Sequence, residues 1–213
     1  MTVFLENIFE ICDGVLAMDN TLQYYNEHAA DFTQDTQMTD MREKYAPFLS
    51  RISSGGHILD LGCGAGRDTK AFLELGYRVT AVDGSEELCR VASAFTGQEV
   101  QQMLFQNIAW QNVFDGVWAC SSLLHCTLDE LPDILQKVSD SLKPGGTLYV
   151  SFKYGDFAGW RNGRYFTNLT EETLAALLNK IPSLHLAETS ISGDVRPGRE
   201  QELWLNAIVE KTE

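Results

Sequence analysis

Three glycines and two aspartates in the first half of the chain have the types and spacing to bind a nucleoside ligand. An apolar run, HILDL, contains Asp60 and leads into Gly62, Gly64 and Gly66, and a second apolar run ends at Asp83, 21 residues after Gly62. Backbone N–H groups of a glycine loop can bind a carboxylate. An acid at a strand end can accept hydrogen bonds from both ribose hydroxyls. The second acid, beside the loop, favours an ammonium or sulfonium group and disfavours a diphosphate.

Two ligand classes compete for this loop. A dinucleotide fingerprint requires a third small residue at position 67, where the helix packs closely and the pyrophosphate approaches. That position is Arg67, so an NAD(P)-dependent oxidoreductase is the less favoured interpretation. A carboxylate, an ammonium, a positive centre and an unphosphorylated ribose together describe S-adenosylmethionine (SAM).

The elements that must position these residues alternate along the chain. Residues 1 to about 50 have helical periodicity. From residue 57 onward, apolar strand-like runs alternate with helical patterns, which predicts a parallel sheet with right-handed crossovers. The strand-like runs are residues 58–61, 78–82, 100–105, 114–121, 147–153, 184–192 and 202–211. The last two follow one another without a helix and predict an antiparallel hairpin at one edge. We expect residues 1–50 to form a helical cap or lid on the domain formed by residues 51–213.

Four motifs in order, ILDLGCGAGRDT, VTAVDGS, FDGVWACSSLLHC and LKPGGTLYVSF, resemble those of class I SAM-dependent methyltransferases. The resemblance covers residues 24–213 and is greatest to compact bacterial, tellurite-resistance-like enzymes, in which a paired tyrosine often precedes the domain. It implies an α/β fold: a Rossmann-like, seven-stranded, mostly parallel sheet with an antiparallel last strand, helices on both faces and an N-terminal helical lid. It also implies SAM as cofactor, S-adenosylhomocysteine as product and membership of EC 2.1.1. It names no substrate.

The cofactor contacts implied by the loop and the resemblance fall at the ends of successive strands. They are Tyr24, Asp60, Gly62, Cys63, Gly64, Gly66, Arg67, Asp83, Gly84, Ser85, Met103, Leu104, Ala119 and Cys120. Asp60 is expected beneath the methionine amino group. Arg67 is equally consistent with an ion pair on the first helical turn, and Ser85 with a helix N-cap. Residues 103–107 include no acid, so adenine recognition would rest on backbone groups and stacking.

Substrate and catalytic residues are sought near the same strand ends. A neutral His125 is suited to remove a proton near pH 7, and a structural, hydrogen-bonded histidine is the alternative. The substrate wall is expected from aromatic and basic residues in the lid and in the segment before the last helix, namely Tyr25, Trp160, Arg161, Arg164 and Tyr165. Its two arginines stand out on an acidic chain and could hold an anionic group. We expect Arg196 and Arg199 to be solvated.

Composition limits the partners and the location of the protein. The 213 residues include 16 basic and 30 acidic side chains, for a net charge of -14. Such a surface repels phosphate backbones, so no nucleic-acid partner is expected. No apolar run approaches the roughly 20 residues that span a bilayer. The N-terminus lacks the positive region of a signal peptide, and the five cysteines include no CxxC pair. These features favour a cytoplasmic protein with reduced thiols.

The leading hypothesis is a methyltransferase acting by in-line displacement on an oxygen, nitrogen, sulfur or metalloid atom of a small molecule. The alternative is a SAM-binding sensor or partner protein that has lost catalysis. The four histidines lack metal-ligand spacing, so no metal site is expected. A monomer or a homodimer is equally compatible with the sequence.

Overall fold

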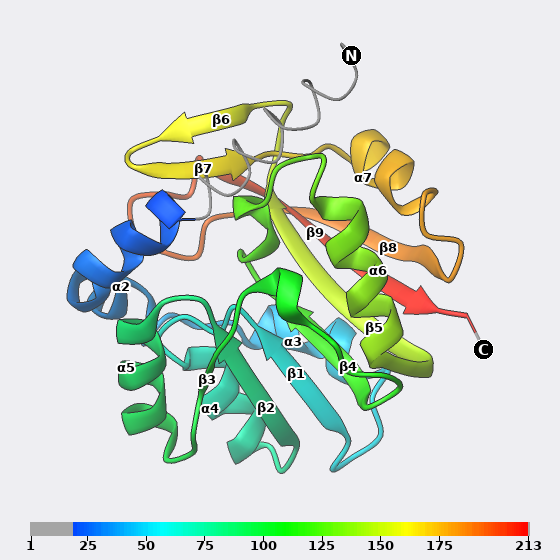
Figure 1. The fold of residues 1–213 in the computed structure, drawn as a ribbon, viewed down its shortest axis with the longest axis horizontal. Helices are drawn as coiled ribbons and strands as arrows, with labels where there is room; N and C mark the ends of the chain where they lie inside the picture. Colours follow the sequence, from blue (N-terminus) through cyan, green and yellow to red (C-terminus); the bar gives the residue numbers. More distant parts are fainter. Residues whose placement is uncertain (1–18, 213) are drawn as a thin grey trace, which may run out of the picture.

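A seven-stranded sheet runs through the centre of the computed structural model, which describes residues 19–212 (Figure 1). The strand order is β3-β2-β1-β4-β5-β9-β8. The bounds are β1 His57–Leu61, β2 Arg78–Asp83, β3 Gln101–Gln102, β4 Phe114–Ala119, β5 Leu142–Lys153, β8 Leu184–Gly193 and β9 Leu203–Lys211. Strands β1 to β5 pair in parallel, whereas β9 is antiparallel to both β5 and β8. The predicted sheet and its final antiparallel hairpin are confirmed, with β8 at the edge.

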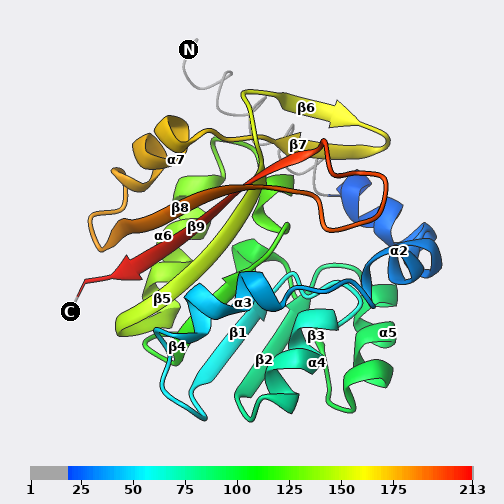
Figure 2. The same ribbon diagram turned by 180° about the vertical axis from the view of Figure 1, so that it is seen from behind.

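Helices cover both faces of the sheet, as predicted. They are α2 Ala29–Thr36, α3 Arg42–Leu49, α4 Arg67–Glu74, α5 Glu86–Thr96, α6 Leu131–Ser141 and α7 Glu171–Leu178, and residues 19–27 are also helical. Single 3-10 turns lie at η1 Phe105–Asn107 and η2 Leu123–His125. Figure 1 shows α6 and α7 on one face, and Figure 2 shows α3 on the other.

Alternation along the strands explains this layering, because successive strand residues point to opposite faces. Leu148 belongs to the cluster under α6 and α7, and the next residue, Tyr149, belongs to the cluster under α3 and α4. The rings of Trp118 and Tyr149 stack with centroids 3.8 Å apart. Phe48 of α3 and Phe72 of α4 surround Trp118 at 5.2 and 5.4 Å between ring centroids. An aromatic layer therefore joins α3 and α4 to the centre of the sheet.

Two local features differ from the sequence-based expectation. The predicted strand at residues 100–105 is reduced to two residues, because the chain leaves the sheet at Met103 and turns through η1. The second is the start of α7, where the sequence has Thr173 in place of the glutamate or glutamine usual in a capping box. A reciprocal capping box nevertheless forms, because Thr173 Oγ1 accepts from the Thr170 N–H at 2.8 Å, and Thr170 Oγ1 accepts from the Thr173 N–H at 3.3 Å.

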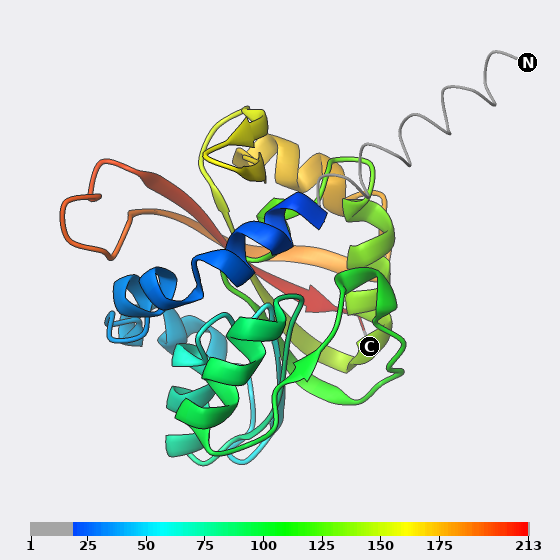
Figure 3. The same cartoon turned by 60° about the vertical axis from the view of Figure 1, so that its left-hand side comes forward.

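A second, two-stranded sheet projects beyond the carboxyl end of β5. It consists of β6 Ala158–Arg161 and β7 Arg164–Thr167, joined through Asn162 and Gly163, whose φ values are 51° and 77°. An Asn-Gly pair with positive φ at both positions is typical of a tight hairpin turn. Figure 3 shows this hairpin, the helices of residues 19–36 and the loop between β8 and β9 at the same end of the main sheet.

The first 18 residues lie outside the described part of the chain, so the helical pattern expected there has no structural counterpart to compare. Within residues 19–212, no helix is both long and apolar enough to cross a membrane.

Candidate active site

The loop between β1 and α4 requires its glycines for two separate reasons. Gly62 and Gly64 have φ values of 77° and 56°, a region that other residues rarely adopt. A Cβ atom on Gly62 would lie 2.4 Å from Ser122 Cβ, and one on Gly64 would lie 2.9 Å from the Phe32 ring. The loop therefore holds a left-handed turn while its backbone stays in close contact with two other segments.

Asp83 joins this loop to the end of β2. One carboxylate oxygen accepts a hydrogen bond from the Gly64 N–H at 2.8 Å, and the other accepts from the Ser85 N–H at 2.8 Å. Burial raises the pKa of Asp83. Ser85 is the N-cap of α5, as predicted, since its Oγ accepts from the Leu88 N–H at 3.2 Å. It also donates to Asn26 Oδ1 at 2.7 Å, which ties the N-terminal helix to this strand end.

A small cavity lies against Asp83 and is lined mainly by apolar side chains. Gly84 forms part of its wall, with Leu22 packed so closely that a Cβ on Gly84 would lie 2.6 Å from it. The Ser122 Oγ atom is buried on the wall with no hydrogen-bond partner in the described structure. The remaining lining residues include Thr21, Leu88, Met103, Leu104 and Phe105. A carboxylate at one end of an apolar slot suits a nucleoside, with its ribose at the acid and its base among the apolar side chains.

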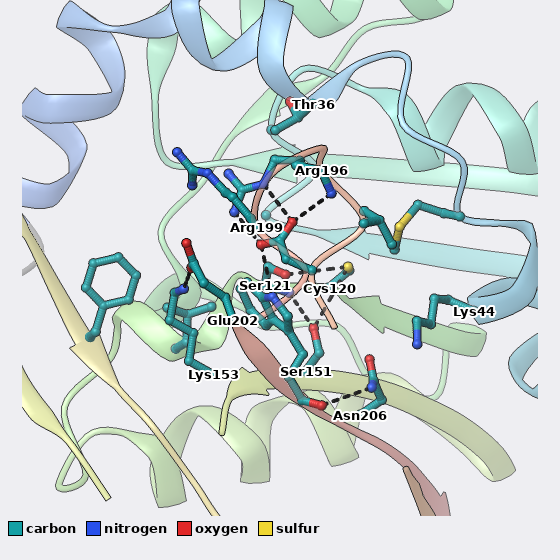
Figure 4. A pocket seen from close by; sticks show the side chains of 18 of the residues that line it. Thr36, Lys44, Cys120, Ser121, Ser151, Lys153, Arg196, Arg199, Glu202 and Asn206 are labelled. Atoms are coloured by element: carbon teal, nitrogen blue, oxygen red, sulfur yellow. Dashed lines mark hydrogen bonds and ion pairs between the residues drawn. The ribbon is translucent and has the colours of Figure 1, made fainter. Parts of the chain in front are cut away.

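A larger cavity of about 690 Å³ adjoins the small one. Figure 4 shows basic side chains from separate elements around it, among them Lys44 of α3, Lys153 of β5 and Arg199 of the β8–β9 loop. The two cavities share six lining residues, namely Tyr25, Phe32, Gly62, Gly64, Ser121 and His125. These residues therefore form the junction between the small cavity at Asp83 and a space of ligand size.

A tyrosine–histidine pair occupies this junction. His125 Nδ1 lies 2.7 Å from the Tyr165 carbonyl oxygen, which can only accept, so Nδ1 carries the proton. Nε2 then accepts from the Tyr25 hydroxyl at 2.8 Å. Burial lowers the pKa of His125 to about 4 and raises the pKa of Tyr25. Both side chains are therefore neutral at pH 7, and the histidine nitrogen that could act as a base is already occupied.

An ion pair lies beneath the glycine loop. Arg67 donates two hydrogen bonds to the carboxylate of Asp68, at 2.6 and 2.9 Å, which is the ion pair that the sequence allowed for. The same carboxylate accepts from the Tyr45 hydroxyl at 2.6 Å and from Trp118 Nε1 at 2.7 Å. Arg67 is thus held by the acid and reaches the larger cavity from a fixed position.

Asp60 is buried beside this pair and lines neither cavity. Its carboxyl group accepts from the Thr69 hydroxyl at 2.5 Å. Burial, with the nearby charge of Asp68, raises the pKa of Asp60 to about 8. The side chain is therefore mostly protonated at neutral pH in the absence of a cationic ligand.

The comparison with known protein families adds to this geometry. Residues 58–146 match a family model described as a methyltransferase domain. The chain therefore contains a methyltransferase domain. At the small cavity the fold brings together the glycine loop and the acid at the end of β2, the two features from which the sequence predicted SAM.

Two curated relatives and one solved structure illustrate the similarity. An uncharacterized methyltransferase of Staphylococcus carnosus is 26% identical over 148 residues, which cover 65% of this chain and 72% of the relative. A ubiquinone biosynthesis O-methyltransferase of Idiomarina loihiensis is 32% identical over 114 residues, 51% of this chain and 47% of the relative. The chain thus spans about half the length of that relative.

The solved structure is the 1,6-didemethyltoxoflavin-N1-methyltransferase of Burkholderia thailandensis, bound to 1,6-didemethyltoxoflavin and S-adenosylhomocysteine. It superposes with a TM-score of 0.73 at 25% identity, covering 96% of this chain and 90% of that one. The similarity therefore extends well beyond the matched domain, to the lid and the C-terminal strands.

Most of the residues predicted for the methyltransferase site are brought together by the fold. Those that line one or both cavities are Tyr25, Gly62, Cys63, Gly64, Arg67, Asp83, Gly84, Met103, Leu104, Cys120, His125, Arg161 and Arg164. Burial raises the pKa of Cys120 to about 11. Its thiol is therefore neutral at pH 7, which is the less nucleophilic form of a cysteine side chain.

The other predicted residues lie outside the cavity walls, and the contacts of three of them explain why. Gly66 packs on α5, where a Cβ would lie 3.0 Å from Ala92 Cβ. Tyr24 stacks on His28 with ring centroids 4.2 Å apart. Trp160 lies on the outer side of its hairpin, with 48% of its surface exposed. The predicted site residues that line neither cavity are Tyr24, Asp60, Gly66, Ser85, Ala119, Trp160 and Tyr165.

Several wall residues were not expected from the sequence. Arg199 is exposed, as predicted, and also lines the larger cavity, whereas Arg196 is only partly exposed there because the β8–β9 loop turns back over the sheet end. Asp194 holds Arg196 through two hydrogen bonds at 2.6 and 2.9 Å. Phe32 and Lys44 reach the cavity from helices whose spacing carries no sign of this role. Within the described residues, no group of three or more His, Cys, Asp or Glu side chains is arranged to hold a metal.

Proposed function

We propose that this protein transfers a methyl group from SAM to an oxygen, nitrogen, sulfur or metalloid atom of a small molecule. The observation that carries the proposal is the junction of the two cavities at Tyr25 and His125. A methyl donor in the small cavity and an acceptor in the large one would meet there, as in-line displacement requires. The acidic chain and the limited cavity volume favour a small acceptor over a macromolecule.

The residues present fit the cofactor. The carboxylate of Asp83 on the cavity wall supports binding of ribose hydroxyls, and Gly62 and Gly64 line the same cavity without side chains. The unpartnered Ser122 Oγ offers a further polar contact on the same wall. When bound, SAM supplies a methyl group already activated by a positive sulfur.

The Tyr25–His125 pair is proposed to orient the acceptor and not to take its proton. A protonated acceptor would lose one proton as it gains the methyl group that bound SAM would supply. A histidine of pKa about 4 is too weak a base to keep that proton at pH 7. We therefore propose that the Tyr25 oxygen, whose own proton is held by Nε2, orients the acceptor while the proton passes to solvent through the larger cavity.

The N-terminal helices are proposed to act as a lid. Thr21 Oγ1 accepts from the Tyr165 N–H at 3.1 Å, and Gln37 Nε2 donates to the Ala65 carbonyl at 3.1 Å. With the Asn26–Ser85 contact described above, these bonds tie residues 19–37 to three parts of the domain. Such a lid would exclude water from the transfer site and would open to admit ligands.

Two measurements test the proposed function. Isothermal titration calorimetry should show binding of SAM and S-adenosylhomocysteine and no binding of NAD. Transfer of a radiolabelled methyl group should then be measured against thiols, amines, phenols and oxyanions. Tight SAM binding with no turnover of any acceptor class would support the sensor alternative, and failure to bind SAM would refute the proposal. We further propose a cytoplasmic monomer or homodimer, which gel filtration and cell fractionation would test.

A further inference from the structure

The larger cavity is basic, although the chain as a whole is strongly acidic. The chain has 16 basic and 30 acidic side chains. Seven of the basic residues line this one cavity, against three acidic residues. The basic set is Lys44, Arg67, Lys153, Arg161, Arg164, Arg196 and Arg199. A concentration of one charge inside a concave, partly desolvated space raises the local concentration of the opposite charge.

The three acids of the cavity are each already paired with one cation. Asp68 holds Arg67 at 2.6 Å, as described above. Asp194 likewise holds Arg196 at 2.6 Å, and Glu202 pairs with Lys153. In the described structure, the other four cations of the cavity form no ion pair with a carboxylate. The cavity therefore has an excess of positive charge that no side chain on its wall neutralises.

Among the cavity cations without a carboxylate partner, Arg164 is the one whose contacts point most directly to an anionic ligand. Its guanidinium lies over the Tyr24 ring at 4.5 Å and the Phe166 ring at 5.2 Å, and Nη1 is 3.4 Å from the Tyr25 hydroxyl. Its Nε atom is buried and has no hydrogen-bond partner in the described residues. A partly buried guanidinium with an unused N–H and no carboxylate partner is unfavourable unless a ligand supplies the anion.

Arg164 also lies close to the junction at which methyl transfer is proposed to occur. Tyr25 lies at the junction of the two cavities and contacts both His125 and Arg164. An oxyanion bound by Arg164 would therefore hold the rest of its molecule close to the transferred methyl group. Arginine is well suited to this role, because its planar fork binds carboxylate or phosphate through two parallel hydrogen bonds.

We propose that the methyl acceptor carries an oxyanionic group, a carboxylate or a phosphate, which Arg164 binds directly with Arg199 contributing at the cavity mouth. This inference rests on the proposed function, because it treats the larger cavity as the acceptor site. The carboxylate of the cofactor is the competing anion. The N–H groups of Gly62, Cys63, Gly64 and Gly66 in the glycine loop already donate to protein oxygens, so the S-adenosylhomocysteine affinity of an Arg164 variant has to separate the two anions.

The test uses the complex with S-adenosylhomocysteine and three probes: benzoate, inorganic phosphate and neutral benzamide. Calorimetry should show saturable binding of benzoate or phosphate with a dissociation constant on the order of 1 mM, and no comparable binding of benzamide. Arg164→Gln should lower the affinity for the anion by about tenfold or more, as the loss of a charged hydrogen bond predicts. Arg164→Lys, which keeps the charge, should retain part of the affinity. Arg90→Gln, on the exposed face of α5, should bind as the wild type does.

Three results would overturn the inference: no anion binding in the wild-type complex, equal binding of benzamide and benzoate, or equal anion affinity in Arg164→Gln. A loss of S-adenosylhomocysteine affinity in Arg164→Gln would also overturn it, because Arg164 would then serve the cofactor. Should Arg164→Gln fail to fold, the exposed Arg199→Gln is expected to weaken the anion about threefold, and unchanged affinity there would count against the inference. Failure of the wild type to bind S-adenosylhomocysteine would refute the proposed function instead, while the same anion titration on the free protein would still report on Arg164.

Discussion

Replacing Asp83 tests the assignment of the small cavity to the nucleoside of SAM. Its carboxylate accepts from the N–H groups of Gly64 and Ser85, both at 2.8 Å, and is buried at the end of β2. Asp83→Ala removes both acceptors and any hydrogen bonds to the ribose. Asp83→Asn keeps one acceptor but turns an amide N–H₂ toward the other backbone donor, so it should be the milder change.

The expected magnitude follows from counting these bonds. A hydrogen bond to a charged group contributes about 1.5–3 kcal/mol, and two backbone donors lose their acceptor in Asp83→Ala. The Gly64 donor borders a cavity that water can enter, so we expect the lower end of the range and a stability loss of about 2–4 kcal/mol. Losing two hydrogen bonds to the ribose should weaken SAM binding by about 30-fold to 150-fold, or about 2–3 kcal/mol. Asp83→Asn should weaken SAM binding by about tenfold.

The assay is calorimetric titration of SAM into each variant after its fold is verified by circular dichroism. Asp115→Asn is the matched control, because Asp115 also accepts from a backbone N–H, that of His57 at 2.7 Å, but near the start of β4. This control should lower stability without changing SAM affinity. Unchanged affinity in a folded Asp83→Ala protein would remove Asp83 from the cofactor site and refute the reasoning.

Three further changes test the junction and the fold. Tyr25→Phe removes the hydroxyl group bonded to His125 and should lower kcat for a protonated acceptor by about tenfold or more, with little change in SAM affinity. Steady-state kinetics will measure this effect, and an unchanged kcat would exclude the proposed role of Tyr25. Burial lowers the folded-state pKa of His125 to about 4, below its unfolded value, so its contribution of about 3 kcal/mol is present above pH 6.5 and lost as the pH falls toward 4. Urea unfolding should therefore show a smaller difference in unfolding free energy between pH 7 and pH 5 in His125→Gln than in the wild type. An equal difference in the two proteins would contradict the burial argument. Gly116→Ala places a Cβ 2.3 Å from Ile52 and 2.7 Å from Phe48 and should destabilise the protein by about 1–3 kcal/mol in the same assay, whereas wild-type stability would show that α3 moves freely.

The features predicted correctly from the sequence are those set by neighbouring residues. The glycine loop after the first strand, the position of Asp83 at the end of the second strand and the N-cap Ser85 each depend on residues within a few positions of one another. One local signal was present in the sequence, but no hairpin was predicted from it. The turn at residues 162–163 contained a strong Asn-Gly signal for the β6–β7 hairpin.

Contacts between distant segments were beyond a reading of local patterns. Tyr25 and His125 are 100 positions apart, and no spacing along the chain shows that their side chains meet at 2.8 Å. The part that Arg196 and Arg199 take in the cavity wall was not visible, because the pattern of a hairpin loop does not show which way the loop turns. The burial of Asp60 beneath the loop depends on how α4 packs on the sheet, and its predicted contact with the cofactor stays a prediction.

The sequence by itself determined that this chain builds a parallel α/β sheet with a glycine loop and a strand-end acid at its carboxyl edge, because steric limits and hydrogen bonding act within a few residues. Only the tertiary structure decided which side chains surround the acceptor and what charge they present. That outcome depends on the simultaneous packing of the lid, the hairpin and the β8–β9 loop around one cavity. The excess of positive charge around Arg164 is a property of that packing, on a chain whose composition is strongly negative.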